Sequence, residues 1–206
     1  FQIADDLIDV KGNAKIAGKK TGKDQKKGKA TLISSLGYMN AIKYCDRIIL
    51  KISEKIKINL IKKLSECSGH LGIAGGQYLD LSYEKKKISK NKIIEMEIKK
   101  TGKLFSFCCA APAIIKNKNI SEIKFFENIG SDIGLLFQIA DDFLDKYGKS
   151  ETLGKPTQQD ESKGKNTLIV HLGEAKTRAL ITDLKSEITN QLSSFPQTDE
   201  LLNCIN

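Results

Sequence analysis

Residues 121–148 read SEIKFFENIGSDIGLLFQIADDFLDKYG, and this stretch decides the fold. Its apolar side chains recur every three or four residues, which is typical of one face of an α-helix. They are Phe125, Ile129, Ile133 and Leu136. Ser121 followed by an acid is a helix-start signal, and Gly148 is a stop signal. The stretch therefore predicts one long helix that carries a group of aspartates at its carboxyl end.

The rest of the chain predicts further helices and no strand. Apolar periodicity favours helices over residues 56–79, 167–172 and 174–192, with Pro196 marking the end of the last one. Ser89 resembles an N-cap for a helix that runs past Gly102 to Ala111, where Pro112 perturbs or ends it. Residues 149–165 are polar and predict a loop. The fold class is therefore expected to be all-α.

Small residues are concentrated within the predicted helix 56–79. They are Ser68, Gly69, Gly72, Gly75 and Gly76. Glycine lowers helix propensity, so close packing or the approach of a ligand is needed to offset that cost. We therefore expect a neighbouring helix to come very near this segment.

Three aspartates near the end of the long helix predict a cation site. Asp141 and Asp145 are separated by four residues and lie about 40° apart on one helix face. Their mutual repulsion, at the negative end of the helix dipole, is relieved by a hard cation such as Mg²⁺, which prefers oxygen ligands. Lys155 and Lys165 follow in a Gly-Lys context and offer compact charges to a metal-bound diphosphate. A solvated acidic helix end is the alternative for the aspartates alone.

One internal repeat stands out. Residues 1–37 align without a gap with residues 137–173, at a constant offset of 136. Both copies contain FQIADD followed by an aspartate three residues later, a Gly-Lys pair, and KGK-x-TLI with a leucine and glycine after it. Asp5, Asp6, Asp9, Lys19 and Lys29 of the first copy match Asp141, Asp142, Asp145, Lys155 and Lys165 of the second. A possible duplicate site is therefore expected near the start.

The composition of the chain limits the kinds of molecule that the protein is expected to bind. The net charge is +9, but the 34 basic residues are dispersed along the chain, which favours a lysine-rich surface or a small acidic ligand over a nucleic-acid module. No apolar run approaches the roughly 20 residues of a membrane span, so no stable membrane insertion is expected. We expect a cytoplasmic location. Five cysteines without a C-x-x-C pair predict neither a disulfide framework nor a zinc site.

These motifs resemble those of one family. FQIADDFLD, then LGK, QD and GKNT, are similar to the second aspartate-rich region of trans-polyprenyl diphosphate synthases, especially bacterial farnesyl or geranyl diphosphate synthases. GGQYLDL at residues 75–81 and KTGKLF at residues 100–105 extend the resemblance, which covers residues 59 to about 195. It implies an isoprenoid synthase-type helical bundle, usually a homodimer. It also implies that Mg²⁺ ions hold an allylic diphosphate, which ionises and is attacked by isopentenyl diphosphate.

The resemblance also assigns roles to individual residues. Asp141 and Asp145 are implied as metal ligands, with Asp142 supporting them. The side chains implied to contact the allylic diphosphate are Lys100, Thr101, Lys155 and Lys165. Phe137 and Gln138 are implied to line the isopentenyl diphosphate pocket, and Gln77 and Asp80 to face the same cavity. The residue types leave simpler roles open, namely core packing for Phe137, structural hydrogen bonds for Gln77 and Asp80, and surface charge for the lysines.

The sequence also departs from the family pattern. It lacks the first aspartate-rich motif and its Arg-Arg-Gly, so the bundle is expected to be incomplete, and the opening at Phe1 indicates a fragment or a processed product. Residues 1–50 read as a duplicate of the second aspartate-rich region and the following helix, and 51–206 as the middle and C-terminal part of a synthase domain. Two functions are expected: a prenyltransferase, or a catalytically silent diphosphate-binding chain or partner subunit. Product length is not predicted, because the family sets it beside the missing motif.

Overall fold

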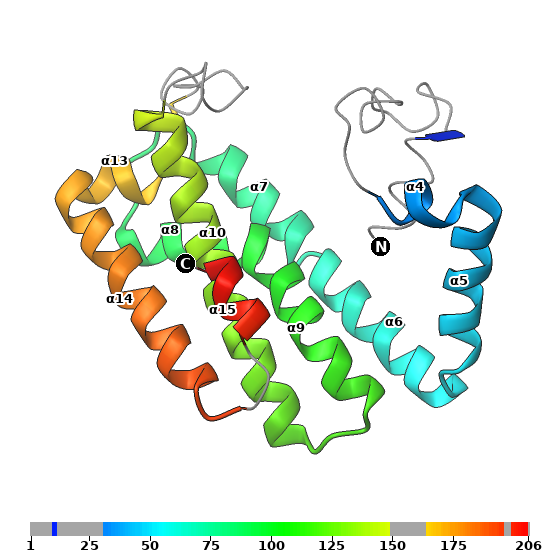
Figure 1. Cartoon of the computed structure of the whole chain (residues 1–206). Coiled ribbons are helices and arrows are strands. Elements are labelled where there is room, and N and C mark those ends of the chain that lie inside the picture. Colours follow the sequence, from blue (N-terminus) through cyan, green and yellow to red (C-terminus); the bar gives the residue numbers. More distant parts are fainter. Residues whose placement is uncertain (1–9, 12–30, 149–163, 196–198, 206) are drawn as a thin grey trace. The chain divides into compact units, whose positions relative to one another are not determined.

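The computed structural model describes residues 10–11, 31–148, 164–195 and 199–205 (Figure 1). Its helices are α4 (Leu32–Leu36), α5 (Tyr38–Leu50), α6 (Glu54–Ser68), α7 (Ile73–Tyr83), α8 (Lys90–Glu97), a π-helix η1 (Ile98–Gly102), α9 (Lys103–Ile115), α10 (Ile120–Tyr147), α13 (Leu168–Leu172), α14 (Glu174–Leu192) and α15 (Asp199–Ile205). No strand occurs in these ranges, which confirms the all-α prediction for the part described. None of the described helices has the length and apolar character needed to cross a bilayer.

The chain forms two compact units, residues 1–54 and residues 55–206. In the first unit, α4 packs against α5, with Ile33 and Ala41 buried. Thr31 caps α4 by accepting a hydrogen bond from the backbone N–H of Ser34. The aspartates and lysines of the possible duplicate site, at positions 5, 6, 9, 19 and 29, lie outside the described residues.

The internal repeat extends to local backbone structure. α4 and α13 are both five-residue helices that begin after a threonine N-cap, Thr31 in one and Thr167 in the other. Both end at a glycine with positive φ, 77° at Gly37 and 78° at Gly173. That conformation is strained for any residue with a Cβ, so both copies need glycine there. The repeated sequence therefore encodes the same helix, with the same start and stop.

The second unit is a helical bundle built around α10. This helix packs against α9, η1 and α14, and α13 covers its later half (Figure 1). One cluster of buried apolar side chains joins α8, α10 and α13, namely Ile93, Met96, Leu135, Ile139 and Leu168. A second joins α10, α14 and α15, namely Ile129, Leu136, Ile188, Leu192 and Ile205. The face of α10 predicted from periodicity thus packs in the second cluster, and Leu135 and Ile139 place a further side of the helix in the first.

Several predicted boundaries were wrong, for local reasons. The expected helix 56–79 is divided, because the chain turns between the end of α6 and the start of α7 at its glycines. The apolar stripe expected there is also largely exposed, with Ile61 65% accessible. Pro112 lies inside α9, which continues to Ile115. α10 begins at Ile120, because Asn119 and not Ser121 accepts the capping hydrogen bond, from the backbone N–H of Glu122.

Candidate functional site

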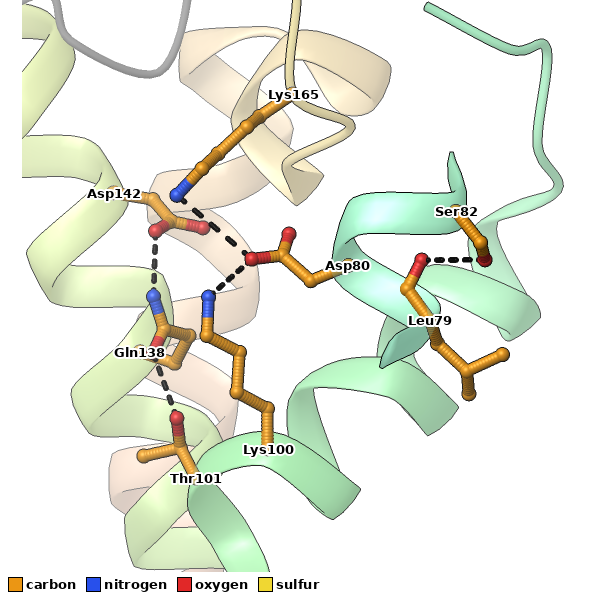
Figure 2. A network of polar contacts seen from close by, with 8 residues as sticks. All are labelled: Leu79, Asp80, Ser82, Lys100, Thr101, Gln138, Asp142 and Lys165. Atoms are coloured by element: carbon orange, nitrogen blue, oxygen red, sulfur yellow. Dashed lines mark hydrogen bonds and ion pairs between the residues drawn. The ribbon is translucent and has the colours of Figure 1, made fainter. Parts of the chain in front are cut away.

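A group of polar side chains meets where α7, η1, α10 and the segment before α13 come together (Figure 2). Asp80 comes from α7, Lys100 from η1, Asp142 from α10, and Lys165 from the segment before α13. They line a cavity of about 20 Å³, together with Met96, Glu97, Gln138, Asn166 and Thr167. Residues 62 positions apart, Asp80 and Asp142, therefore share one small polar cavity. We call the following six residues the polar cluster: Asp80, Lys100, Thr101, Gln138, Asp142 and Lys165.

An ion pair between α7 and η1 forms one side of the polar cluster. The Nζ atom of Lys100 donates a hydrogen bond to Asp80 Oδ2 at 2.5 Å, and Lys165 Nζ lies 3.8 Å from the same oxygen. Asp80 is 6% exposed, whereas the two lysine side chains are 24% and 23% exposed. The carboxylate is therefore buried behind two ammonium groups that still reach solvent. Such an arrangement can offer positive charge to an anion.

A chain of hydrogen bonds forms the other side. The hydroxyl of Thr101 donates to Gln138 Oε1 at 2.8 Å, and Gln138 Nε2 donates to Asp142 Oδ1 at 2.7 Å. These two bonds fix the amide orientation of Gln138, because its oxygen must face the hydroxyl and its nitrogen the carboxylate. η1 and α10 are thereby linked through polar side chains at the cavity wall.

The π-helix η1 places Lys100 and Thr101 in the cluster. Residues 98–102 interrupt the regular helix between α8 and α9, and such wide turns are frequent at functional sites. α7 approaches this turn so closely that a methyl group on Gly76 would overlap the backbone nitrogen and Cα of Lys100. The close approach expected for the glycine-rich segment therefore occurs, at Gly76 against η1.

Lys165 is positioned by a backbone anchor. Asn166 Nδ2 donates hydrogen bonds to the carbonyl oxygens of Tyr83, at 2.6 Å, and Lys86, at 2.9 Å. The backbone N–H of Lys85 donates to the carbonyl of Gly164 at 2.9 Å. These bonds hold residues 164–166 against the end of α7, which carries Asp80. Lys165 is thus directed at Asp80 by neighbours on both sides of it in the sequence.

Glu97 is the unusual member of the cavity wall. Its side chain is 1% exposed, and neither carboxyl oxygen is within hydrogen-bond geometry of a partner. Burial raises the pKa of Glu97 well above its ordinary value, and the charge of Asp142 raises it further. The backbone N–H of Leu168 and the ammonium of Lys100 act in the opposite direction but do not outweigh burial.

The structure brings together only part of the predicted set. Lys100, Gln138, Asp142, Lys165 and Asp80 line the cavity, and Thr101 bonds to one of them. The other predicted residues that are described are not among those that line the cavity: Asp141 is partly buried, Asp145 is 8% exposed, Gln77 is exposed, and Phe137 is 56% exposed with its ring against that of Phe105. Lys155 lies outside the described residues.

The donor set is compatible with Mg²⁺ held jointly with a ligand. The described residues contain no group of three or more acidic, histidine or cysteine side chains that could hold a metal alone. Asp141 and Asp145 nevertheless supply oxygen donors at the helix end beside the polar cluster, and Mg²⁺ commonly takes one or two carboxylates and completes its shell with water and phosphate. These residues therefore fit a magnesium ion that a diphosphate helps to hold.

Four residues of the cavity lining were not predicted from the sequence, namely Met96, Glu97, Asn166 and Thr167, and two of them show why. Glu97 precedes Lys100 by three residues in EMEIKKTG, so a helical projection alone would have placed its carboxyl near that lysine. Asn166 directly follows Lys165, but nothing in the sequence indicates that its amide would cap α7, more than 80 residues earlier. The position of Glu97 near Lys100 could therefore have been predicted from the sequence, whereas the role of Asn166 depends on tertiary contact.

The comparisons with known proteins agree on one family. The profile of the family described as polyprenyl synthetase matches residues 1–66 and 36–204. Farnesyl diphosphate synthase of Micrococcus luteus is 35% identical over 152 residues, covering 73% of this chain and 52% of that protein. Geranylgeranyl pyrophosphate synthase 4 of Arabidopsis thaliana is 30% identical, covering 82% and 46%. The chain spans about half the length of these curated relatives.

Solved structures give the same result for the fold. A geranyltransferase from Helicobacter pylori, complexed with magnesium and isoprenyl diphosphate, superposes with a TM-score of 0.68 at 26% identity. The match covers 85% of this chain and 62% of that one. An FPP/GFPP synthase from Zymomonas mobilis superposes with a TM-score of 0.63 at 29% identity, covering 86% and 64%.

Proposed function

The chain belongs to the polyprenyl synthetase family, and from this premise we propose that it carries the diphosphate-binding half of a prenyltransferase site. The reaction would join isopentenyl diphosphate to an allylic diphosphate. The allylic carbon–oxygen bond breaks, its electron pair leaves with the diphosphate, and the double bond of isopentenyl diphosphate attacks the cation. A proton is then lost, and the product is five carbons longer.

The polar cluster is the observation that supports this proposal. Lys100 and Lys165 each place a partly exposed ammonium group beside the buried carboxylate of Asp80, and this shared partner holds both in position. A diphosphate leaving group gains negative charge as its bond breaks, so fixed positive charge beside it lowers the barrier. The ammonium groups of Lys100 and Lys165 would supply that charge, and the Thr101–Gln138–Asp142 chain would hold the cavity wall still.

Magnesium would be held by Asp141 and Asp145 and would neutralise the diphosphate as it departs. In this assignment Asp142 has a different task, because it faces the cavity and accepts from Gln138. We propose that Phe137 of α10 and Gln77 of α7 contact the substrate from the exposed sides of these two helices. We also propose Lys155 as a further diphosphate contact.

The experiment is a prenyl-transfer assay with the whole chain. With Mg²⁺, labelled isopentenyl diphosphate and dimethylallyl diphosphate, we expect labelled prenyl product and released diphosphate. Asp141→Asn should lower the rate about 100-fold, because it removes one carboxylate ligand of the magnesium ion that would stabilise the leaving group. Asp183→Asn, on the exposed face of α14, is the matched control and should behave as the parent.

Equal rates for Asp141→Asn and the parent would count against the assignment of the metal site.

Complete absence of product favours the second function, a catalytically silent diphosphate-binding chain or partner subunit. Its support is that one relative is named as the large subunit of a heterodimeric synthase. It predicts magnesium-dependent pyrophosphate binding in calorimetry without turnover, and activity only after a full-length synthase is added.

We also propose that residues 55–206 associate as a homodimer. Large apolar side chains are exposed on α6, on α7 and between them, namely Ile58, Ile61, Leu64, Leu71, Tyr78 and Leu81. Monomers rarely leave so many on neighbouring helices without a partner. Sedimentation velocity should give a dimer for the parent and a monomer for Ile61→Glu, with unchanged helix content. A monomeric parent at micromolar concentration would contradict this proposal.

A further inference from the structure

The turn that follows α7 carries three consecutive lysines, Lys85, Lys86 and Lys87, which we call the lysine turn. All three are exposed, and none of them forms an ion pair with a carboxylate among the described residues. One acid, Glu84, directly precedes them. The turn therefore offers excess positive charge to solvent, and the proposed diphosphate site assigns it no task.

Lys85 has an unusual backbone conformation. Its φ is 57°, in the left-handed region that residues with a Cβ adopt only under strain. Within the described ranges the other non-glycine residue with positive φ is Asn117, and asparagine tolerates this region better than lysine does. A strained conformation persists where its surroundings hold it, so the position of Lys85 is fixed by its contacts.

Hydrogen bonds hold the lysine turn against the segment that carries Lys165. The backbone N–H of Lys85 donates to the carbonyl oxygen of Gly164 at 2.9 Å. On the other side of Lys165 in the sequence, Asn166 Nδ2 donates to the carbonyl oxygen of Lys86, also at 2.9 Å. Lys165 belongs to the polar cluster and lies between these two anchors. The lysine turn is therefore attached directly to one edge of the polar cluster.

Gly164 gives the side chain of Lys85 a place beside Lys165. Its φ is 66°, and a methyl group on its Cα would lie 2.9 Å from Cγ and 3.7 Å from Cε of Lys85. The lysine side chain thus extends across Gly164 as far as Cε, and its ammonium group is one bond further on. Two positive-φ residues together place one exposed ammonium group next to the residue that precedes Lys165.

Ammonium groups in this position attract an anion before it reaches the polar cluster. At physiological ionic strength the attraction between charges is screened over about 8 Å, and the side chain of Lys85 crosses the direct neighbour of Lys165. Surface charge of one sign beside a site raises the association rate of an oppositely charged ligand by about 10- to 1,000-fold. Asp80 partly offsets the charges of Lys100 and Lys165, whereas the lysine turn has no such partner in the described structure.

We propose that the lysine turn attracts the diphosphate group of the substrate and guides it to the polar cluster, with Lys85 as the innermost residue. The inference rests on the proposed function, because it concerns the same ligand. Lys100 and Lys165 contact the bound diphosphate, whereas the lysine turn acts through long-range attraction. Salt screens such attraction strongly, but it screens contacts inside a partly buried site much less.

Calorimetry with magnesium pyrophosphate and the whole chain tests this role at about 50 mM and about 1 M salt. Lys85→Met keeps the aliphatic stem across Gly164 and removes the charge, so the affinity at low salt should fall about threefold. Lys85→Gln/Lys86→Gln/Lys87→Gln should lower it about tenfold. At high salt, where charges act over only about 3 Å, both variants should match the parent. Lys85→Arg keeps the charge and should match the parent at either salt.

The matched control is Lys116→Gln/Lys118→Gln/Lys124→Gln, which removes the same charge from exposed lysines around the start of α10. Lys124 precedes Gln138 by 14 residues along this helix, about 21 Å, which is well beyond the screening distance. The control should match the parent at either salt. Lys85→Gly separates binding from folding, because glycine adopts positive φ without strain. Its urea midpoint should not fall below that of the parent, while its affinity should fall as in Lys85→Met.

The outcomes separate the role of the lysine turn from the proposed function. Equal affinities of the parent and the Lys85→Gln/Lys86→Gln/Lys87→Gln variant at low salt would overturn the guiding role and leave the diphosphate site in place. A loss that persists at high salt would also overturn it, because it would indicate a direct contact or a structural effect. A parent that binds no magnesium pyrophosphate at either salt would overturn the diphosphate site itself, and the guiding role with it.

Discussion

Lys100→Met is expected to weaken magnesium-dependent pyrophosphate binding, and any prenyl transfer, about 1,000-fold. The ammonium of Lys100 is the closest cation to Asp80 and reaches solvent at the cavity, where a diphosphate would gain charge. Removal of one preorganised charge from such a site typically costs about 100- to 1,000-fold. Here the loss also leaves Asp80 with Lys165, at 3.8 Å, as its remaining partner among the described residues. Isothermal titration calorimetry with pyrophosphate and Mg²⁺ measures the effect.

The double variant Lys100→Met/Asp80→Asn separates binding from folding. Lys100→Met alone should lower the free energy of unfolding by about 2 kcal/mol, because it strips a buried carboxylate of its nearer partner. Neutralisation of Asp80 should restore most of that stability without restoring pyrophosphate affinity. Lys92→Met, on the exposed side of α8, is the control. A double variant that regains affinity would show that Lys100 matters only for folding.

Gly76→Ala should destabilise residues 55–206 by about 3 kcal/mol. The added methyl would meet backbone atoms of Lys100 and Lys99, which cannot move aside as the end of a flexible side chain could. Relief requires α7 and η1 to separate, and this displaces Asp80 from Lys100. We therefore expect a lower urea midpoint together with weaker pyrophosphate binding.

Ala74→Ser is the matched control for Gly76→Ala. It adds one atom on an exposed position of the same helix and should change neither measurement. Unchanged stability of Gly76→Ala would mean that α7 does not approach η1 as closely as the structure places it. Unchanged pyrophosphate affinity in a destabilised Gly76→Ala would mean that the pairing of Asp80 with Lys100 is not needed for binding.

Apolar periodicity and capping residues predicted most of the helices, but tertiary packing decided where some of them begin and end. Asn119 and Ser121 offer similar capping oxygens, but Asn119 accepts from the backbone N–H of Glu122 and the hydroxyl of Ser121 donates to Asn119, so α10 begins after Asn119. Pro112 removes one hydrogen bond but does not end α9, which continues to Ile115 and packs against α10. Local preference loses in such places to the burial of a whole helix face.

The sequence by itself determined the helical class, the repeat of residues 1–37 at 137–173, and the family, because these depend on residue order and spacing alone. Spacing also places Asp141 and Asp145 on one face of a helix, but it does not say which neighbour that face meets. Only the tertiary structure decided that Asp142 faces the cavity, that Asp80 pairs with Lys100, and that Glu97 is buried beside them. The physical reason is that helix periodicity fixes directions within one element, whereas the close approach of α7, η1 and α10 fixes which side chains share a cavity.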